Sequence, residues 1–70
     1  MPPWRQLAAV YRERIQSGKL VPGARLPSIS DLSQEYDLAI TTVQKAIAAL
    51  KEEGLIVTSP MGTFVTPADR

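Results

Sequence analysis

Cysteine and histidine are both absent from this sequence of 70 residues. The chain therefore cannot form disulfides, supply a thiolate nucleophile, use imidazole for acid–base chemistry or build most zinc sites. Its seven acidic residues are scattered, and so short a chain can hardly wall off a pocket. We therefore expect no enzyme activity, no metal and no cofactor.

Long apolar runs are missing too. No stretch approaches the ~18–20 apolar residues of a membrane span, and the first residues hold no apolar signal-peptide core. The composition, 44% hydrophobic and 21% charged, is that of a globular protein. We expect one domain over residues 1–70, in the cytoplasm and without a membrane partner.

The net charge of +1 is unevenly distributed along the chain. Residues 1–25 carry five basic residues against one acidic residue, whereas residues 28–53 carry two basic residues against five acidic ones. The first part is therefore +4 and the second −3. The net charge alone identifies no partner.

Two helices are predicted in the first half. Apolar residues at helical spacing predict a helix over about 4–17, with Gly18 suited to a left-handed cap. Ser28, with Asp31 three residues later, forms a capping box and predicts a second helix over about 28–36. Residues 24–26, beside the Pro22-Gly23 turn signal, are predicted to be a short extended segment.

The second half predicts a helix and a hairpin. An apolar face at spacing i, i+3, i+4 and i+7 predicts a third helix over about 40–53, with the core residues Val43, Ala46, Ile47 and Leu50. Its start has two interpretations, a capping box at Thr41 with Gln44 or a turn that ends earlier, at Ala39. Two β-branched runs around Pro60 and Gly62 predict a hairpin over about 55–66.

This order of elements predicts a mainly α fold with a small β-hairpin, the winged helix-turn-helix. Residues 24–26 decide whether its antiparallel sheet has two or three strands. In helix-turn-helix proteins the second helix of the pair enters the major groove of DNA. That helix is here the one near Thr41, whose outer side carries Thr41, Lys45, Ala48 and Glu52, flanked by Thr42, Gln44 and Ala49.

These residue types suit DNA. Lys45 can neutralise a phosphate or contact guanine, and Gln44 offers the donor and acceptor that match adenine. The hydroxyls of Thr41 and Thr42 can bond phosphates, and their methyl groups can pack on thymine. Two simpler interpretations stay open, because paired threonines at a helix start are often only caps and Gln44-Lys45 could be an ordinary solvated face.

The chain resembles the GntR family of bacterial regulators over residues 4–66. The matching segments are residues 15–20, 22–28, 32–36, 41–46, 50–55 and 62–65, in that order. The resemblance implies a winged helix that reads the major groove with its third helix and brings the wing glycine near the minor groove. It also implies sequence-specific binding of double-stranded DNA by a transcriptional regulator, and we expect this regulator to repress by occupying a promoter. The candidate DNA-binding residues are Ser28, Ser30, Ala39, Ile40, Thr41, Thr42, Gln44, Lys45, Met61 and Gly62.

The sequence departs from the family pattern where arginines are usual. Ser30, Ile40 and Gln44 each stand at a position that often holds arginine, and Met61 stands where the wing often has a basic residue. Each neutralised phosphate contributes about 0.9 to the slope of log affinity against log salt concentration. We therefore predict weak binding by the monomer, with little dependence on salt.

A protein-interaction module is the competing hypothesis. The −3 balance of residues 28–53 and the missing arginines favour it, with Ile40, Met61 and Trp4 as an apolar contact surface. Family members usually carry a C-terminal domain that binds an effector and dimerises the protein, whereas this sequence ends at Arg70. We expect no effector-binding domain in this chain, whether it is an excised domain or a stand-alone form. A homodimer on a palindromic site is compatible with either.

Overall fold

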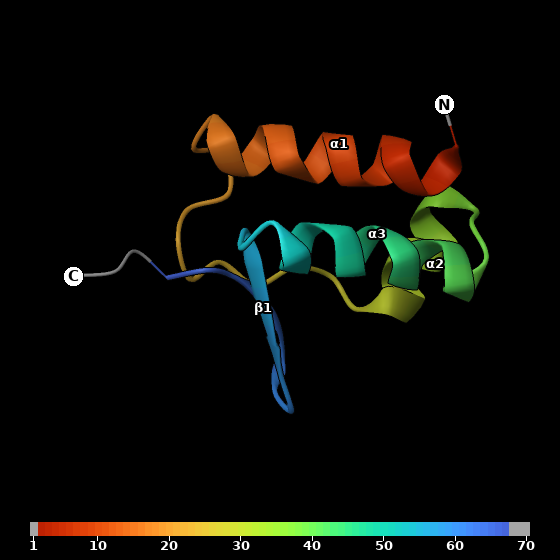
Figure 1. The fold of residues 1–70 in the computed structure, drawn as a ribbon. Coiled ribbons are helices and arrows are strands. Elements are labelled where there is room, and N and C mark those ends of the chain that lie inside the picture. Colours follow the sequence, from red (N-terminus) through yellow and green to blue (C-terminus); the bar gives the residue numbers. More distant parts are fainter. Residues whose placement is uncertain (1, 68–70) are drawn as a thin grey trace.

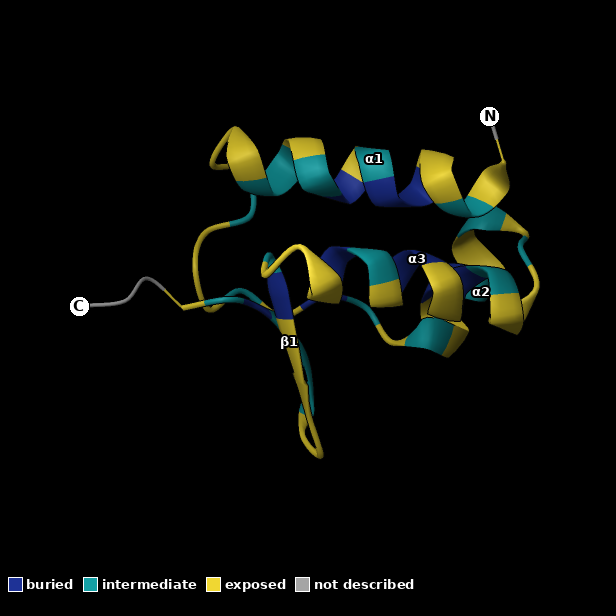
Figure 2. Cartoon of the chain, in the orientation of Figure 1, coloured by how far each residue is buried: buried dark blue, intermediate teal, exposed yellow. Residues whose placement is uncertain are grey.

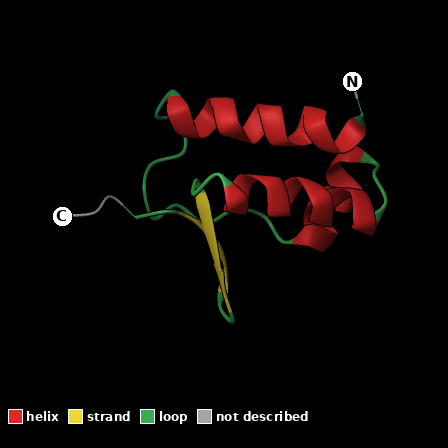
Figure 3. Cartoon of the chain, in the orientation of Figure 1, coloured by secondary structure: helices red, strands yellow, loops and turns green. Residues whose placement is uncertain are grey.

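The computed structural model describes residues 2–67, which form three helices followed by one hairpin (Figures 1 and 3). The elements are α1 (Pro3–Gln16), α2 (Ile29–Tyr36), α3 (Ile40–Glu52), β1 (Ile56–Ser59) and β2 (Gly62–Val65). Each predicted boundary lies within one residue of these bounds. The mainly α fold with a small hairpin is confirmed. The predicted range 1–70 also includes Met1 and residues 68–70, among them Arg70, which lie outside the described residues.

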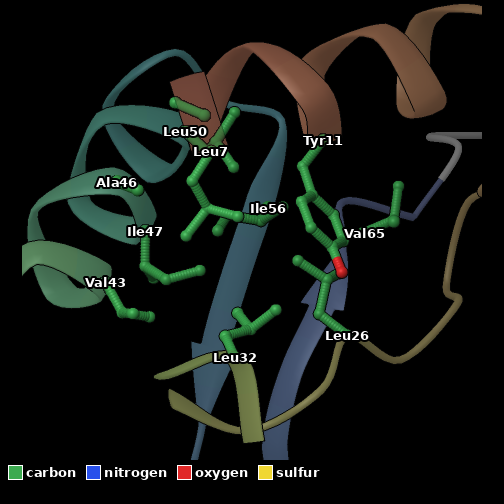
Figure 4. Packing of buried hydrophobic residues seen from close by; sticks show 11 residues of the cluster. Leu7, Tyr11, Leu26, Leu32, Val43, Ala46, Ile47, Leu50, Ile56 and Val65 are labelled. Carbon is green, nitrogen blue, oxygen red and sulfur yellow. The ribbon is translucent and has the colours of Figure 1, made fainter. Parts of the chain in front are cut away.

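One apolar core joins all three helices to the base of the hairpin (Figure 4). Helix α1 runs alongside α3, α2 packs against one end of α3, and the hairpin projects from the other end (Figure 1). Burial of apolar surface is the main stabilising contribution in so small a domain. The buried side chains are Leu7, Ala8, Tyr11, Leu26, Leu32, Val43, Ala46, Ile47, Leu50, Ile56 and Val65.

The sheet has two strands and one additional bridge. Strands β1 and β2 are antiparallel, with Ile56 opposite Val65 and Ser59 opposite Gly62. The segment predicted at 24–26 adds only the isolated bridge of Arg25 to Phe64. Its flanking backbone bonds run from the Leu26 amide to the Thr63 carbonyl, 2.8 Å, and from the Val65 amide to the Ala24 carbonyl, 2.7 Å. The loop before α2 is thereby fixed to the outer edge of β2.

An exposed ion pair fastens α1 to the carboxyl end of α3. The Arg12 guanidinium donates to both carboxylate oxygens of Glu53, with a distance of 2.7 Å from Nε to Oε1. This bond lowers the pKa of the Glu53 carboxyl and raises that of Arg12. One of the five acids of the −3 segment is therefore neutralised within the protein.

Neither a membrane span nor a metal cluster is found in the part of the chain that the structure describes. No helix there is long and apolar enough to cross a bilayer. Within the same residues, acidic side chains do not gather in groups of three or more that could hold a metal ion.

Candidate nucleic-acid interface

A tight left-handed turn sets the angle between α2 and α3. Asp37 adopts φ 55° and ψ 50°, a conformation that aspartate tolerates better than most residues. The Leu38 amide then donates to the Ser33 carbonyl at 3.0 Å, and the half-buried Leu38 side chain packs against the core. The two helices therefore form the helix-turn-helix expected from the sequence.

Helix α3 begins at Ile40, with Ala39 as its N-cap and no side chain capping it. The capping box at Thr41 with Gln44 is therefore wrong, and the earlier start at Ala39 is correct. Because Thr41 lies within the first turn, its hydroxyl is not used as an N-cap. The uncapped amides carry the partial positive charge of the helix N-terminus toward solvent.

The outer face of α3 is exposed over its first two turns (Figure 2). Thr41, Gln44 and Lys45 are exposed, and Thr42 is half-buried. The opposite face forms the core, as the apolar spacing predicts. The polar side of this helix is thus accessible and could lie along the groove of a DNA duplex.

Lys45 has an aromatic neighbour that sequence reasoning missed. Its Nζ lies 5.3 Å from the centre of the Trp4 ring, and the Arg5 guanidinium lies 5.6 Å from the same ring. Contacts of this kind are worth about 0.5–1 kcal/mol at exposed sites. The side chain of Lys45 is therefore held on the side of α3 that faces α1, and it shares the Trp4 ring with a second cation. Only the packing of α1 on α3 brings these residues together, so no local sequence pattern predicts the contact.

Ser28 and Ser30 lie at the start of α2, and both are exposed. The Ser28 hydroxyl accepts a hydrogen bond from the Asp31 amide at 3.0 Å, which confirms the predicted cap. Ser28 thus has a structural task whatever it touches outside the protein. Ser30 occupies the first turn of the helix, and its side chain is exposed.

The tip of the hairpin presents Met61 and Gly62. Met61 is 77% exposed, the largest value among the exposed large hydrophobic residues. The Met61 amide donates to the Ser59 hydroxyl at 3.2 Å, which holds the turn in shape. Gly62 has φ 139°, a conformation that other residues rarely adopt.

A guanidinium lies against this glycine. A methyl carbon added to Gly62 would lie 3.0 Å from Nε of Arg25 and 3.4 Å from its Cζ. Arg25 lies in the extended segment predicted at 24–26 and is not among the predicted site residues. The sequence gives only a weak indication that Arg25 lies near Gly62, because this proximity depends on the bridge between Arg25 and Phe64.

The two interface elements carry little charge. Lys45 is the only charged residue among the ten candidate site residues, and the chain from Gly54 to Pro67 contains none. On α3, the acidic Glu52 lies at the carboxyl end, away from the exposed first turns. The exposed apolar residues of the competing hypothesis, Ile40 and Met61, lie on different elements, at the start of α3 and at the hairpin tip.

A helix-turn-helix whose second helix is exposed, followed by a projecting hairpin, defines a winged helix-turn-helix domain. The family model described as bacterial regulatory proteins, gntR family, matches residues 3–65. The chain belongs to the GntR family, as the resemblance implied.

Comparison with known proteins places the chain among transcription regulators. It is 41% identical over 58 residues to an uncharacterised HTH-type transcriptional regulator of Streptomyces coelicolor, covering 83% of this chain and 22% of that protein. It spans 14–27% of the length of the first curated relatives that it matches.

Two solved structures share the fold closely. YtrA of Sulfolobus acidocaldarius, a GntR-family transcription factor, superposes with a TM-score of 0.91 at 35% identity, covering 99% of this chain and 73% of that one. The AraR DNA-binding domain in complex with operator ORR3 superposes with a TM-score of 0.88 at 30% identity, covering 94% and 81%. These findings bear out the expectation of a DNA-binding regulator domain.

Proposed function

We propose that this chain binds double-stranded DNA sequence-specifically, in the bacterial cytoplasm at the nucleoid, and represses transcription by occupying a promoter. Helix α3 lies in the major groove, and the hairpin, here called the wing, approaches the adjacent minor groove. The supporting observation is the free outer face of α3, with Thr41, Gln44 and Lys45 exposed beside an uncapped helix start. The likeness to AraR, whose domain was solved with its operator, favours the same use of this fold.

Each candidate residue has a task in this complex. The α3 amides and the Thr41 and Thr42 hydroxyls bind phosphate oxygens, and Gln44 reads a base edge. Lys45 neutralises a phosphate from its place beside Trp4. Ile40, 44% exposed, packs on a thymine methyl group, and Ala39 lets the backbone approach. Ser28 and Ser30 donate to phosphates at the start of α2, and Met61 and Gly62 face the groove at the wing tip.

Selection of bound sequences from random duplexes tests the proposal. A shared motif among the selected duplexes is the expected result, and a palindromic motif would also show that two copies bind together. Failure to enrich any motif, with no binding to mixed duplex DNA at low salt, would contradict DNA binding.

A salt titration on the selected duplex gives the first quantitative prediction. The slope of log affinity against log salt should be shallow, about 0.9 for each phosphate neutralised, because Lys45 is the only cation among the ten candidates. Fluorescence anisotropy from ~50 to ~200 mM salt measures it. A steep slope with tight binding to arbitrary duplexes would contradict the assigned contacts.

The second candidate function is binding to a protein partner. The observation that favours it is the exposure of Met61 and Ile40, which are apolar where the family pattern is basic. In an NMR titration with duplex DNA, DNA reading predicts shifts at residues 39–48 and 60–63. Shifts confined to α1 would count against groove reading by α3 and favour this second candidate.

A further inference from the structure

The wing has no charge of its own, although its proposed target is a polyanion. From Gly54 to Pro67 the sequence contains no lysine, arginine, aspartate or glutamate. A charged side chain that attracts DNA phosphates to the wing must therefore come from another segment of the chain. The Arg25 side chain meets this requirement, because its guanidinium lies against Gly62.

The backbone holds Arg25 in register with the wing. Hydrogen bonds on either side of it, from Leu26 to Thr63 and from Val65 to Ala24, make Arg25 and Phe64 a non-hydrogen-bonded pair. Side chains in such a pair lie close together on one face, and long ones reach the diagonal neighbour two residues along. The diagonal neighbour toward the tip is Gly62, which has no side chain to block the guanidinium.

The guanidinium lies against the glycine. Its Nε, Nη2 and Cζ atoms all fall within 3.0–3.4 Å of the position that a Gly62 Cβ would occupy. Arg25 is exposed, and among residues 2–67 its side chain has no ion pair, hydrogen bond or ring contact. The Arg25 guanidinium is already positioned and has no partner within the protein, so it can bind an external anion with little further loss of side-chain entropy.

We propose that Arg25 supplies the cation of the wing and contacts a backbone phosphate at the edge of the minor groove. The proposal rests on the proposed DNA binding and adds a contact from the loop before α2. A phosphate is the expected partner, because backbone phosphates line the edge of the minor groove and carry the charge opposite to that of the guanidinium. Gly62 is then needed both for its backbone conformation and as the surface on which Arg25 lies.

The test compares two arginine variants on the selected duplex. Arg25→Gln should bind about fivefold more weakly at ~0.15 M salt, and its salt slope should fall by about 0.9 for each bound copy. The matched control is Arg14→Gln, which removes the same charge from α1, where Arg14 lies over the Tyr11 ring. Far-ultraviolet circular dichroism verifies that both variants are folded.

Two further variants separate phosphate contact from base reading. Arg25→Lys keeps the charge that neutralises the phosphate and should keep most of the affinity, the salt slope and the selected motif. Gly62→Ala adds a carbon where Arg25 lies, and its effect should be smaller in the Arg25→Gln background than in the wild type.

Each outcome has a distinct meaning. If Arg25→Gln behaves like Arg14→Gln while the wild type binds its motif, the role of Arg25 is wrong and the proposed function stands. If Arg25→Lys or Arg25→Gln selects a different motif from the wild type, Arg25 reads a base and does not contact a phosphate, and the proposal is wrong. If the wild type selects no motif and binds no duplex, the proposed function itself is wrong.

Discussion

At the scale of single residues, Ser28 combines two roles that a substitution can separate. Its hydroxyl caps α2 through the Asp31 amide, and the proposed function also places it near a phosphate. Ser28→Ala should lower the free energy of unfolding by about 1 kcal/mol, because the cap is lost. Ser28→Asp keeps a good cap and should restore most of that stability. Urea denaturation monitored by circular dichroism measures both.

For DNA affinity, the order of the two variants should be the reverse of their order in stability. The aspartate carboxylate would repel a nearby phosphate, so Ser28→Asp should bind DNA more weakly than Ser28→Ala although it is the more stable protein. Anisotropy with the selected duplex measures the affinities. Equal DNA affinity of both variants would show that Ser28 does not lie near a phosphate and serves only as the N-cap of α2.

At the scale of elements, the outer face of α3 can be tested without disturbing the core. Lys45→Ala should weaken DNA binding about fivefold through one lost phosphate contact. Thr42→Ala should weaken it about two- to tenfold through one lost hydrogen bond. Neither residue is buried, so both variants should stay folded. Isothermal titration or anisotropy gives the affinities.

Lys51→Ala is the matched control, since Lys51 is an exposed basic residue of the last turn of the same helix. Its affinity should be close to that of the wild type. Unchanged affinity in both Lys45→Ala and Thr42→Ala would favour the protein-partner candidate over groove reading.

The elements also show what a sequence can and cannot predict. The apolar spacing of Val43 and Leu50 defined the buried face of α3, because helical periodicity is a local property. The helix start was ambiguous, since a capping box at Thr41 competed with a turn that ends at Ala39, and the helix begins after Ala39 although alanine offers no side-chain cap. The contact of Trp4 with Lys45 depends on packing between segments far apart in the chain, so no local rule reveals it.

At the scale of the whole molecule, the core contains one ionisable side chain whose titration reports on folding. Burial, followed by the neighbouring Tyr36 hydroxyl, raises the pKa of Tyr11 from 10.0 to about 12. Because the folded state holds this proton more tightly than the unfolded state, its contribution to stability is complete below pH 10. That contribution is lost as the pH rises toward 12, by at most about 1.4 kcal/mol per pH unit.

Denaturant unfolding at pH values from 9 to 12 measures this loss. Tyr11→Phe should lose stability less steeply over the same range, because the phenol is gone while the ring still packs in the core. Ultraviolet absorbance of the folded protein should show a tyrosine that ionises late in the wild type and is missing in Tyr11→Phe. Parallel stability curves for the two proteins would contradict the shift.

The attachment of the loop before α2 to β2 has a consequence for domain engineering. Amides at Gly23, Leu26 and Val65 bond across this junction, so the outer edge of the hairpin is completed by residues far earlier in the chain. A chimera that exchanges only residues 55–66 between two regulators would join a foreign strand to an unmatched loop. Such an exchange should transfer the shape and charge of the donor hairpin only if residues 23–26 are exchanged with it.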